Sequence, residues 1–186
     1  AGWHLLTLIN EVLDLSRIES GADRIEREAV AVAPLVDRCV SMMQNEAARR
    51  RIALDVLPIA ASVQALADPV RLKQVLLNLL SNAIKYNRDD GRVTLSATAD
   101  GAHVRLAVRD TGRGLSAEQL DKLYQPFNRL GLESAAIEGT GIGLVISLKL
   151  TERMGGRLDV WSEPGVGSEF SVTLPPPRLR GCTWSM

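Results

Sequence analysis

Two asparagines and a lysine lie on one face of an expected helix near the middle of the chain. The stretch from Asp68 to Tyr86 opens with a capping aspartate followed by proline, which suits a first helical turn. At about 100° per residue, Asn78, Asn82 and Lys85 fall on one side, and leucines and valines cover the other. Amide oxygens bind cations and a lysine binds phosphate. The helix carries either a binding face or the ordinary polar face of an amphipathic helix.

A carboxylate stands between an apolar strand pattern and a glycine-rich turn at residues 110–114, Asp-Thr-Gly-Arg-Gly. A partly buried Asp110 can accept a hydrogen bond from an exocyclic amine. Gly112 and Gly114 can let the backbone approach a flat ligand closely. A plain turn from strand to loop would show the same residues, so the motif has two interpretations.

A second glycine series, Gly139-Thr-Gly-Ile-Gly143, leads into an expected helix over residues 142–154. Backbone N–H groups at a helix N-terminus bind phosphate, and glycines remove the side chains that would block it. A flexible hinge would look the same. Arg129 closes the stretch Tyr-Gln-Pro-Phe-Asn-Arg just upstream, within reach of a terminal phosphate.

Helical and strand patterns mix without strict alternation, which predicts an α+β fold with helices layered on a mixed sheet. Leu5, Leu8, Val12 and Leu15 follow a 3,4,3 spacing in a first helix over residues 3–20, so wide an apolar stripe that we expect self-association or exposure. The other expected helices cover residues 34–50, 116–123 and 142–154. The expected strands cover residues 24–30, 52–57, 63–67, 92–99, 103–110, 157–162 and 168–174.

Composition excludes several classes of protein. Apolar residues make up 46% and charged residues 24% of the 186 positions, an ordinary globular balance. Lys+Arg and Asp+Glu are both 22, so there is no basic excess of the kind that binds nucleic acid. Two cysteines give neither a disulfide framework nor a metal motif. No apolar run approaches the ~20 residues of a membrane span.

Taken in order, these motifs resemble the ATP-binding catalytic domain of sensor histidine kinases, a branch of the Bergerat (GHKL) fold. The amide helix comes first, then Asp-x-Gly-x-Gly, Pro-Phe-x-Arg and Gly-x-Gly-x-Gly, and last Gly165-Val-Gly167. The resemblance covers about residues 24–174. Residues 1–21 resemble the second helix of that family's dimerisation hairpin. The implied fold is a two-layer α/β sandwich, a mixed sheet with helices on one face, preceded by one bundle-type helix.

The resemblance implies a role for each matching residue. Asn82 would bind Mg²⁺, with Asn78 beside it on the metal or a phosphate, and Lys85 and Arg129 would hold phosphates. The nucleotide's adenine side would meet Tyr86, Asp110, Gly112, Gly114 and, from the last strand, Thr173. The phosphates would be wrapped by Gly139, Thr140, Gly141 and Gly143, with residues 130–140 as a mobile lid over ATP. Asn82, Lys85 and Arg129 form the implied catalytic set.

The implied reaction is phosphoryl transfer to a protein side chain. Members of the wider fold that hydrolyse ATP place a glutamate four residues before the metal-binding asparagine, and here that position is Asn78. Without a general base there, hydrolysis is disfavoured. The family's acceptor is a histidine on the first hairpin helix, followed by an acidic residue. Neither His4 nor His103 matches that pattern, so we expect the chain to bind Mg²⁺-ATP without phosphorylating itself.

The resemblance also predicts domains and partners. Residues 1–23 would be the hairpin helix, residues 24–176 the ATP-binding domain and residues 177–186 a disordered tail. Partners would be ATP, the receiver domain of a response regulator and, through the N-terminal helix, a second copy. We expect a cytoplasmic domain within a soluble or membrane-anchored protein. Two alternatives stay open: a non-catalytic nucleotide-binding or dimerisation module, and a protein serine kinase of the same fold.

Overall fold

The computed structural model describes residues 2–130 and 139–177, with side chains from Leu5 onward. Its elements are α1 (Gly2–Glu19), β1 (Glu28–Ala31), α2 (Val32–Arg49), β2 (Ala53–Val56), β3 (Gln64–Ala67), α3 (Pro69–Lys85), β4 (Arg92–Ala99), β5 (Val104–Asp110), α4 (Ala117–Asp121), α5 (Gly143–Arg153), β6 (Arg157–Glu163) and β7 (Gly167–Leu174). These bounds agree with the expected elements to within two residues, with one exception. β1 begins at residue 28 rather than 24.

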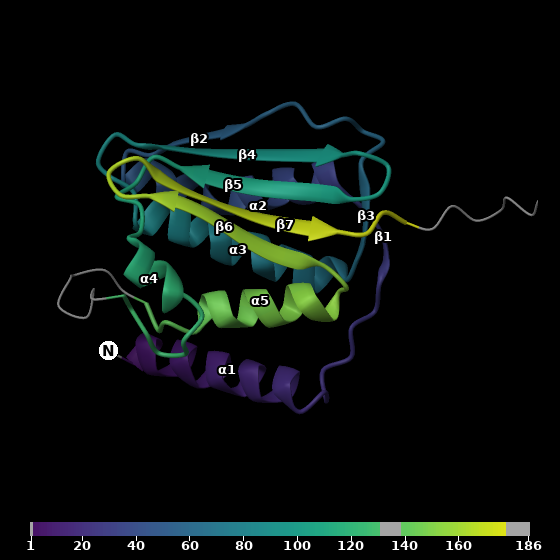
Figure 1. Ribbon diagram of the computed structural model, residues 1–186, viewed down its shortest axis with the longest axis horizontal. Helices are drawn as coiled ribbons and strands as arrows, with labels where there is room; N and C mark the ends of the chain where they lie inside the picture. Colours follow the sequence, from purple (N-terminus) through teal and green to yellow (C-terminus); the bar gives the residue numbers. More distant parts are fainter. Residues whose placement is uncertain (1, 131–138, 178–186) are drawn as a thin grey trace, which may run out of the picture.

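A mixed sheet and a layer of helices form the body of the molecule. The sheet has the order β2-β4-β5-β7-β6, in which β2 and β4 are parallel and the other neighbours antiparallel. A separate antiparallel pair joins β1 and β3. Helices α2, α3 and α5 gather on one side of the large sheet (Figure 1). The predicted α+β class, with helices on one face of a mixed sheet, is confirmed.

The central helix α3 shows how sequence sets position. The Asp68 carboxylate accepts hydrogen bonds from the N–H groups of Val70 and Arg71, and Pro69 occupies the first turn. Leucines, valine, alanine and isoleucine on one side are buried in the core, namely Leu72, Val75, Leu76, Leu79, Leu80, Ala83 and Ile84. Because that side is fixed against the sheet and α2, the polar side is presented at the opposite surface of the helix.

Antiparallel pairing of β5 with both β4 and β7 fixes which residues lie opposite one another in the sheet. The β4–β5 turn is closed by Asp100, whose Oδ1 accepts from the N–H groups of Ala102 and His103. In the resulting register, Asp110 at the end of β5 lies opposite Ser168 at the start of β7. The end of one strand and the beginning of another therefore meet at the same edge of the core.

Helix α1 has a neighbour that the sequence did not predict. It runs along the outer side of α5 (Figure 1), where Ile18 is only 4% exposed and Leu8 and Leu15 are partly buried. On this side the stripe is therefore covered within the chain, whereas we expected self-association or exposure. The other side is apolar and 40–61% exposed, at Leu5, Leu6, Ile9, Val12 and Leu13, as the width of the stripe predicted.

Some expectations fall outside the described residues. They include most of the predicted lid, at residues 131–138, and the tail at residues 178–186. The side chain of His4 also lies outside the described part. Among the helices that are described, none is long and apolar enough to cross a bilayer.

Candidate functional site

A cavity of about 1050 Å³ opens at the end of the helical layer. Its lining comes from α3, the turn after β5, the segment between α4 and α5, the start of α5, the start of β7 and α1. That size is at the upper end of the range for small-molecule sites. Of the thirteen site residues predicted above, those inside the cavity are Asn78, Asn82, Lys85, Tyr86, Asp110, Gly114, Arg129, Gly139, Thr140, Gly141 and Gly143.

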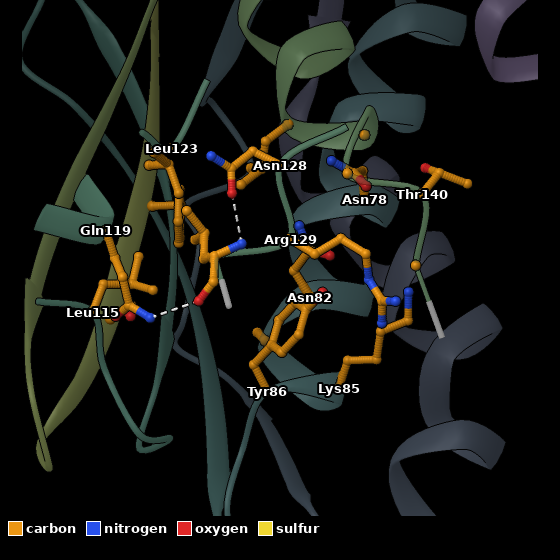
Figure 2. A pocket seen from close by; sticks show the side chains of 18 of the residues that line it. Asn78, Asn82, Lys85, Tyr86, Leu115, Gln119, Leu123, Asn128, Arg129 and Thr140 are labelled. Carbon is orange, nitrogen blue, oxygen red and sulfur yellow. Dashed lines mark hydrogen bonds between the residues drawn. The ribbon is translucent and has the colours of Figure 1, made fainter. Parts of the chain in front are cut away.

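The polar face of α3 forms one wall of the cavity. The side-chain amide of Asn78 on this face is oriented by a residue of α5. Asn78 Nδ2 donates to Ser147 Oγ at 2.8 Å, and Ser147 is only 1% exposed. A Cβ on Gly143 would lie 2.4 Å from Asn78 Oδ1, so only glycine fits there without displacing the amide. Asn78 therefore joins α3 to the start of α5. Asn82, one turn further along, lines the cavity (Figure 2).

A buried carboxylate, that of Asp110 at the end of β5, also lines the cavity. Asp110 is 8% exposed and its Oδ1 accepts from the Gly112 N–H at 2.8 Å. Burial raises the pKa of Asp110, while hydrogen bonds from the backbone N–H groups of Gly112 and Ser168 partly oppose that rise. The site combines an apolar surround, which Phe170 helps to form, with one strong acceptor. Such an end suits a flat ligand that carries an amine.

The two glycines of this turn are required by close packing. A Cβ on Gly112 would lie 2.5 Å from the Tyr86 carbonyl oxygen. Gly114 has φ +67°, and a Cβ there would lie 2.0 Å from the Glu163 carbonyl oxygen. Gly112 does not line the cavity but packs behind Asp110, so its effect on a ligand passes through the carboxylate that it hydrogen-bonds.

The glycine series lines the cavity beside Lys85 and Asn78 of α3. Gly141 has φ +74°, and a Cβ on it would lie 2.9 Å from the Phe127 carbonyl carbon. α5 then begins at Gly143 without any side-chain cap on its first N–H groups. Open N–H groups at a helix start favour an anion. Lys85 and Arg129, the two predicted cations, line this same cavity (Figure 2).

Arg129 is positioned by hydrogen bonds on either side of it. Gln119 Nε2 donates to the Leu130 carbonyl at 2.9 Å, and the Leu130 N–H donates to Asn128 Oδ1 at 2.8 Å (Figure 2). Gln119 itself belongs to the capping box that starts α4, where Ser116 is the partner. The short helix therefore holds the segment that presents the arginine.

Thr173 lies outside this cavity. Ser168 and Phe170 line it, and alternation along β7 places residues at odd steps from them on the other sheet face. Thr173 borders a second, smaller cavity of about 550 Å³, together with Arg105, Arg157 and His103. The structure gives Thr173 no place at the predicted adenine wall. Counting strand parity from Phe170 would have indicated this from sequence.

Several lining residues were not predicted. Arg113 lies with its guanidinium carbon 5.9 Å from the centre of the Tyr86 ring. Gln119, Leu115, Leu123 and Ser168 complete the wall near the turn after β5. Thr7, Leu8 and Glu11 enter from α1. No sequence pattern signals the α1 residues, because their place depends on how α1 packs against α5.

The donor set bears on any metal ion. Among the described residues, no group of three or more His, Cys, Asp or Glu side chains could hold an ion. The cavity instead offers amide oxygens beside the glycine series. Mg²⁺ keeps several waters and commonly binds through one or two protein oxygens plus substrate phosphates. The residues present therefore fit a magnesium ion that arrives with a nucleotide.

Comparison with known proteins gives a family match and similar folds. Residues 67–178 match the family described as histidine kinase-, DNA gyrase B- and HSP90-like ATPases. The sensor protein GacS of Pseudomonas syringae pv. syringae is 39% identical over 184 residues, covering 95% of this chain and 20% of GacS. The sensor histidine kinase RcsC of Escherichia coli K12 is 38% identical over 178 residues, covering 92% of this chain and 18% of RcsC.

Solved structures agree with the fold. Full-length ShkA in complex with AMPPNP superposes with a TM-score of 0.80 at 32% identity, over 96% of this chain and 37% of that one. The histidine kinase ThkA in complex with the response regulator TrrA gives a TM-score of 0.74 at 24% identity, over 92% and 47%. The chain spans about a fifth of the length of the curated relatives named above.

Proposed function

The chain belongs to the histidine kinase-, DNA gyrase B- and HSP90-like ATPases, as the ATP-binding catalytic domain of a sensor histidine kinase, and from this premise we propose how its cavity works. Asp110 accepts a hydrogen bond from the adenine amino group. Lys85, Arg129 and the loop at residues 139–143 hold the phosphates. Asn82 binds Mg²⁺, and the γ-phosphoryl group passes to a histidine on a dimerisation helix.

One observation carries this proposal. Stretches far apart in sequence bring a buried acceptor, two amides, two cations and a glycine loop to one cavity. The acceptor lies at the end of β5, and the glycine loop lies beside Lys85 and Asn78 of α3. A purine triphosphate has the same polarity, with an amine at one end and negative charge at the other.

The chain's own groups supply positioning and charge neutralisation. Bound Mg²⁺ would supply further positive charge on the phosphates. Asn78 occupies the place where ATP-hydrolysing relatives carry a glutamate, and its amide is held by Ser147. With no carboxylate at that position to activate water, transfer to an incoming side chain is favoured over hydrolysis. This is why we propose a kinase rather than a rapid ATPase.

The proposed partners follow from the surface and from the relatives. The apolar side of α1, which Leu6 and Leu13 help to form, is exposed and suits a second copy of the same helix. The crystallised complex of ThkA with a response regulator supports a receiver domain as the final phosphoryl acceptor. We place the domain in the cytoplasm, where ATP and such a receiver would be found.

Nucleotide binding measured by calorimetry with and without Mg²⁺ tests this function. We expect wild type to bind ATP more tightly with Mg²⁺. Asn82→Ala should abolish the effect of Mg²⁺ while keeping adenosine binding, because Asn82 acts on the ion. Asp110→Asn should weaken binding of adenosine and ATP alike, by about tenfold, since it removes a charged hydrogen-bond acceptor.

Asn87→Ala is a matched control for the asparagine. Asn87 donates to the Arg92 carbonyl and does not line the cavity, so its variant should keep the response to Mg²⁺. Equal responses to Mg²⁺ in wild type and Asn82→Ala would exclude the assigned metal ligand. Wild type that binds no adenine nucleotide would refute the proposed function.

A further inference from the structure

Helix α1 does more than lie near the nucleotide cavity. Polar contacts hold it along α3 and α5: Gln74 Nε2 donates to Asp14 Oδ2 at 3.3 Å, Lys149 pairs with Glu19 at 3.5 Å, and Arg153 donates to the Ile18 carbonyl at 3.4 Å. Just beyond the helix, Arg71 pairs with Asp23 at 2.5 Å. These contacts fix the register of α1 and place Thr7, Leu8 and Glu11 in the cavity wall.

Glu11 makes a direct contact with the glycine series. The Thr140 hydroxyl donates to Glu11 Oε2 and accepts from the Ile142 N–H at 3.3 Å. A hydroxyl has one proton to donate. In this arrangement Thr140 therefore cannot also donate to a phosphate, although Gly139 and Gly141 on either side of it border the phosphate end.

Glu11 carries a negative charge, whereas Lys85 and Arg129, which line the same cavity, are cations. Among the described lining residues, Glu11 and Asp110 are the carboxylates, and Asp110 is the one that we assign to the adenine. Lys85 and Arg129 at the phosphate end favour an anion, whereas the Glu11 carboxylate opposes one. The nearer a ligand's negative charge comes to Thr140, the more unfavourable the carboxylate becomes.

We propose that Glu11 is a specificity-determining residue of the nucleotide site, which opposes the terminal phosphates and so makes triphosphate binding and α1 docking antagonistic. This inference rests on the proposed function of the cavity. If a triphosphate oxygen accepts the hydrogen bond of the Thr140 hydroxyl in place of Glu11, the contact between α1 and the glycine loop is broken. By linkage, docking of α1 then lowers the affinity for the triphosphate by the same factor. Adenosine, which has no phosphate, does not affect α1.

Calorimetric titration of adenosine, ADP and ATP separates this effect from general changes in the cavity. Glu11→Gln keeps an oxygen that can accept from Thr140 and removes the charge. We expect it to bind ATP about fivefold more tightly than wild type, ADP by a smaller factor, and adenosine equally. Glu19→Gln is the matched control on the same helix. Its exposed pair with Lys149 lies outside the cavity, so its affinities should stay within about twofold of wild type.

Amide hydrogen exchange of α1 gives a second readout that does not depend on affinity. ATP should speed exchange over residues 5–18 in wild type, and adenosine should leave it unchanged. In Glu11→Gln the response to ATP should be smaller, because the contact that ATP disrupts no longer carries charge. Slower exchange with ATP would overturn the antagonism.

The remaining outcomes also decide. Equal changes in affinity for all three ligands would show that Glu11 acts on the cavity in general and would overturn the inference. Weaker ATP binding by Glu11→Gln only when Mg²⁺ is present would make Glu11 an ion ligand and would also overturn it. If wild type and Glu11→Gln bind no nucleotide at all, the proposed function fails along with it. If wild type binds ATP and Glu11→Gln has the same relative affinities for adenosine, ADP and ATP, the inference is wrong but the proposed function stands.

Discussion

At the scale of single residues, Asp110 shows how a strand end becomes a recognition group. Its carboxylate is buried at the end of the central strand β5, and it accepts from the N–H of Gly112, two positions along the chain. Burial favours the neutral acid, whereas the N–H donors favour the anion, and burial has the larger effect on the pKa. An amino group of a ligand would add a donor to the charged form.

The raised pKa of Asp110 gives the first prediction, on pH. An acid with a raised pKa takes up its proton at a higher pH than an ordinary aspartate, whose pKa is about 3.9. The proposed adenine contact needs the ionised form. Adenosine affinity should therefore be constant at high pH and fall, by about tenfold at most, as the pH drops through the Asp110 pKa.

Adenosine is the ligand of choice for this titration because it has no phosphate to titrate. Affinities measured by calorimetry at a series of pH values should show the fall in wild type and none in Asp110→Asn. A variant that retained the same pH dependence would assign the titrating group to another residue.

At the scale of elements, the junction of α3 and α5 controls the shape of the phosphate end. Asn78 reaches from one helix to Ser147 on the other, and Gly143 leaves the space its amide needs. One hydrogen bond and one missing side chain thus join the two helices at the cavity. The effect of a substitution at Asn78 on the free energy of unfolding should therefore depend on the residue at position 143, and the reverse.

Gly143→Ala tests this junction. The new Cβ would displace the Asn78 amide and leave the buried Ser147 hydroxyl without its donor, at a cost of about 1–3 kcal/mol, offset by up to about 1 kcal/mol of helix propensity. The free energy of unfolding, measured by urea denaturation, should fall by about 1 kcal/mol. ATP affinity should fall with it.

Asn78→Ala supplies the second arm of a double-mutant cycle. Without the Asn78 amide, alanine at position 143 has nothing to displace and should be neutral or slightly stabilising. We expect a coupling of about 1 kcal/mol or more between the two positions. Strict additivity would mean that the helices do not meet through this pair.

The elements themselves were largely predictable, for local reasons. Asp68 and Pro69 mark the start of α3, Asp100 and Gly101 mark the β4–β5 turn, and alternation marks both strands of that hairpin. These signals act over a few residues. The cavity residues from α3, β5 and the glycine series were found for the same reason.

What the sequence did not predict depends on packing between distant segments. α1 lies on α5, so Glu11 enters the cavity more than a hundred positions from its partner Thr140. No spacing or composition rule links the two. Thr173 is a different case, because strand parity alone would have assigned it to the face away from the cavity.

At the scale of the whole molecule, the nucleotide cavity and His103 lie apart. His103 is largely exposed near the β4–β5 turn and borders the second cavity, with Asp100 as a neighbour at 3.9 Å. Nothing in the described structure brings its imidazole toward the glycine series. We therefore propose that the acceptor histidine comes from another helix.

Incubation with γ-labelled Mg²⁺-ATP should therefore leave the chain unlabelled, even though it binds the nucleotide. Both properties are measured on one sample, by calorimetry and by acid-labile label after gel separation. Acid-labile label that the His4→Ala variant lacks would overturn the expectation that the chain does not phosphorylate itself. Addition of a dimerisation hairpin from a related kinase, with its acceptor histidine, should produce label on the hairpin.

Resonance mapping of the backbone amides is the most direct test of the central claim that one cavity holds both ends of a nucleotide. With adenosine, shifts should be confined to Tyr86, residues 110–114 and the start of β7. With Mg²⁺-ATP, the same shifts should persist and extend to residues 82–85 and 139–143. Shifts around the second cavity near Arg105 and Thr173, or different sites for adenosine and ATP, would contradict the account.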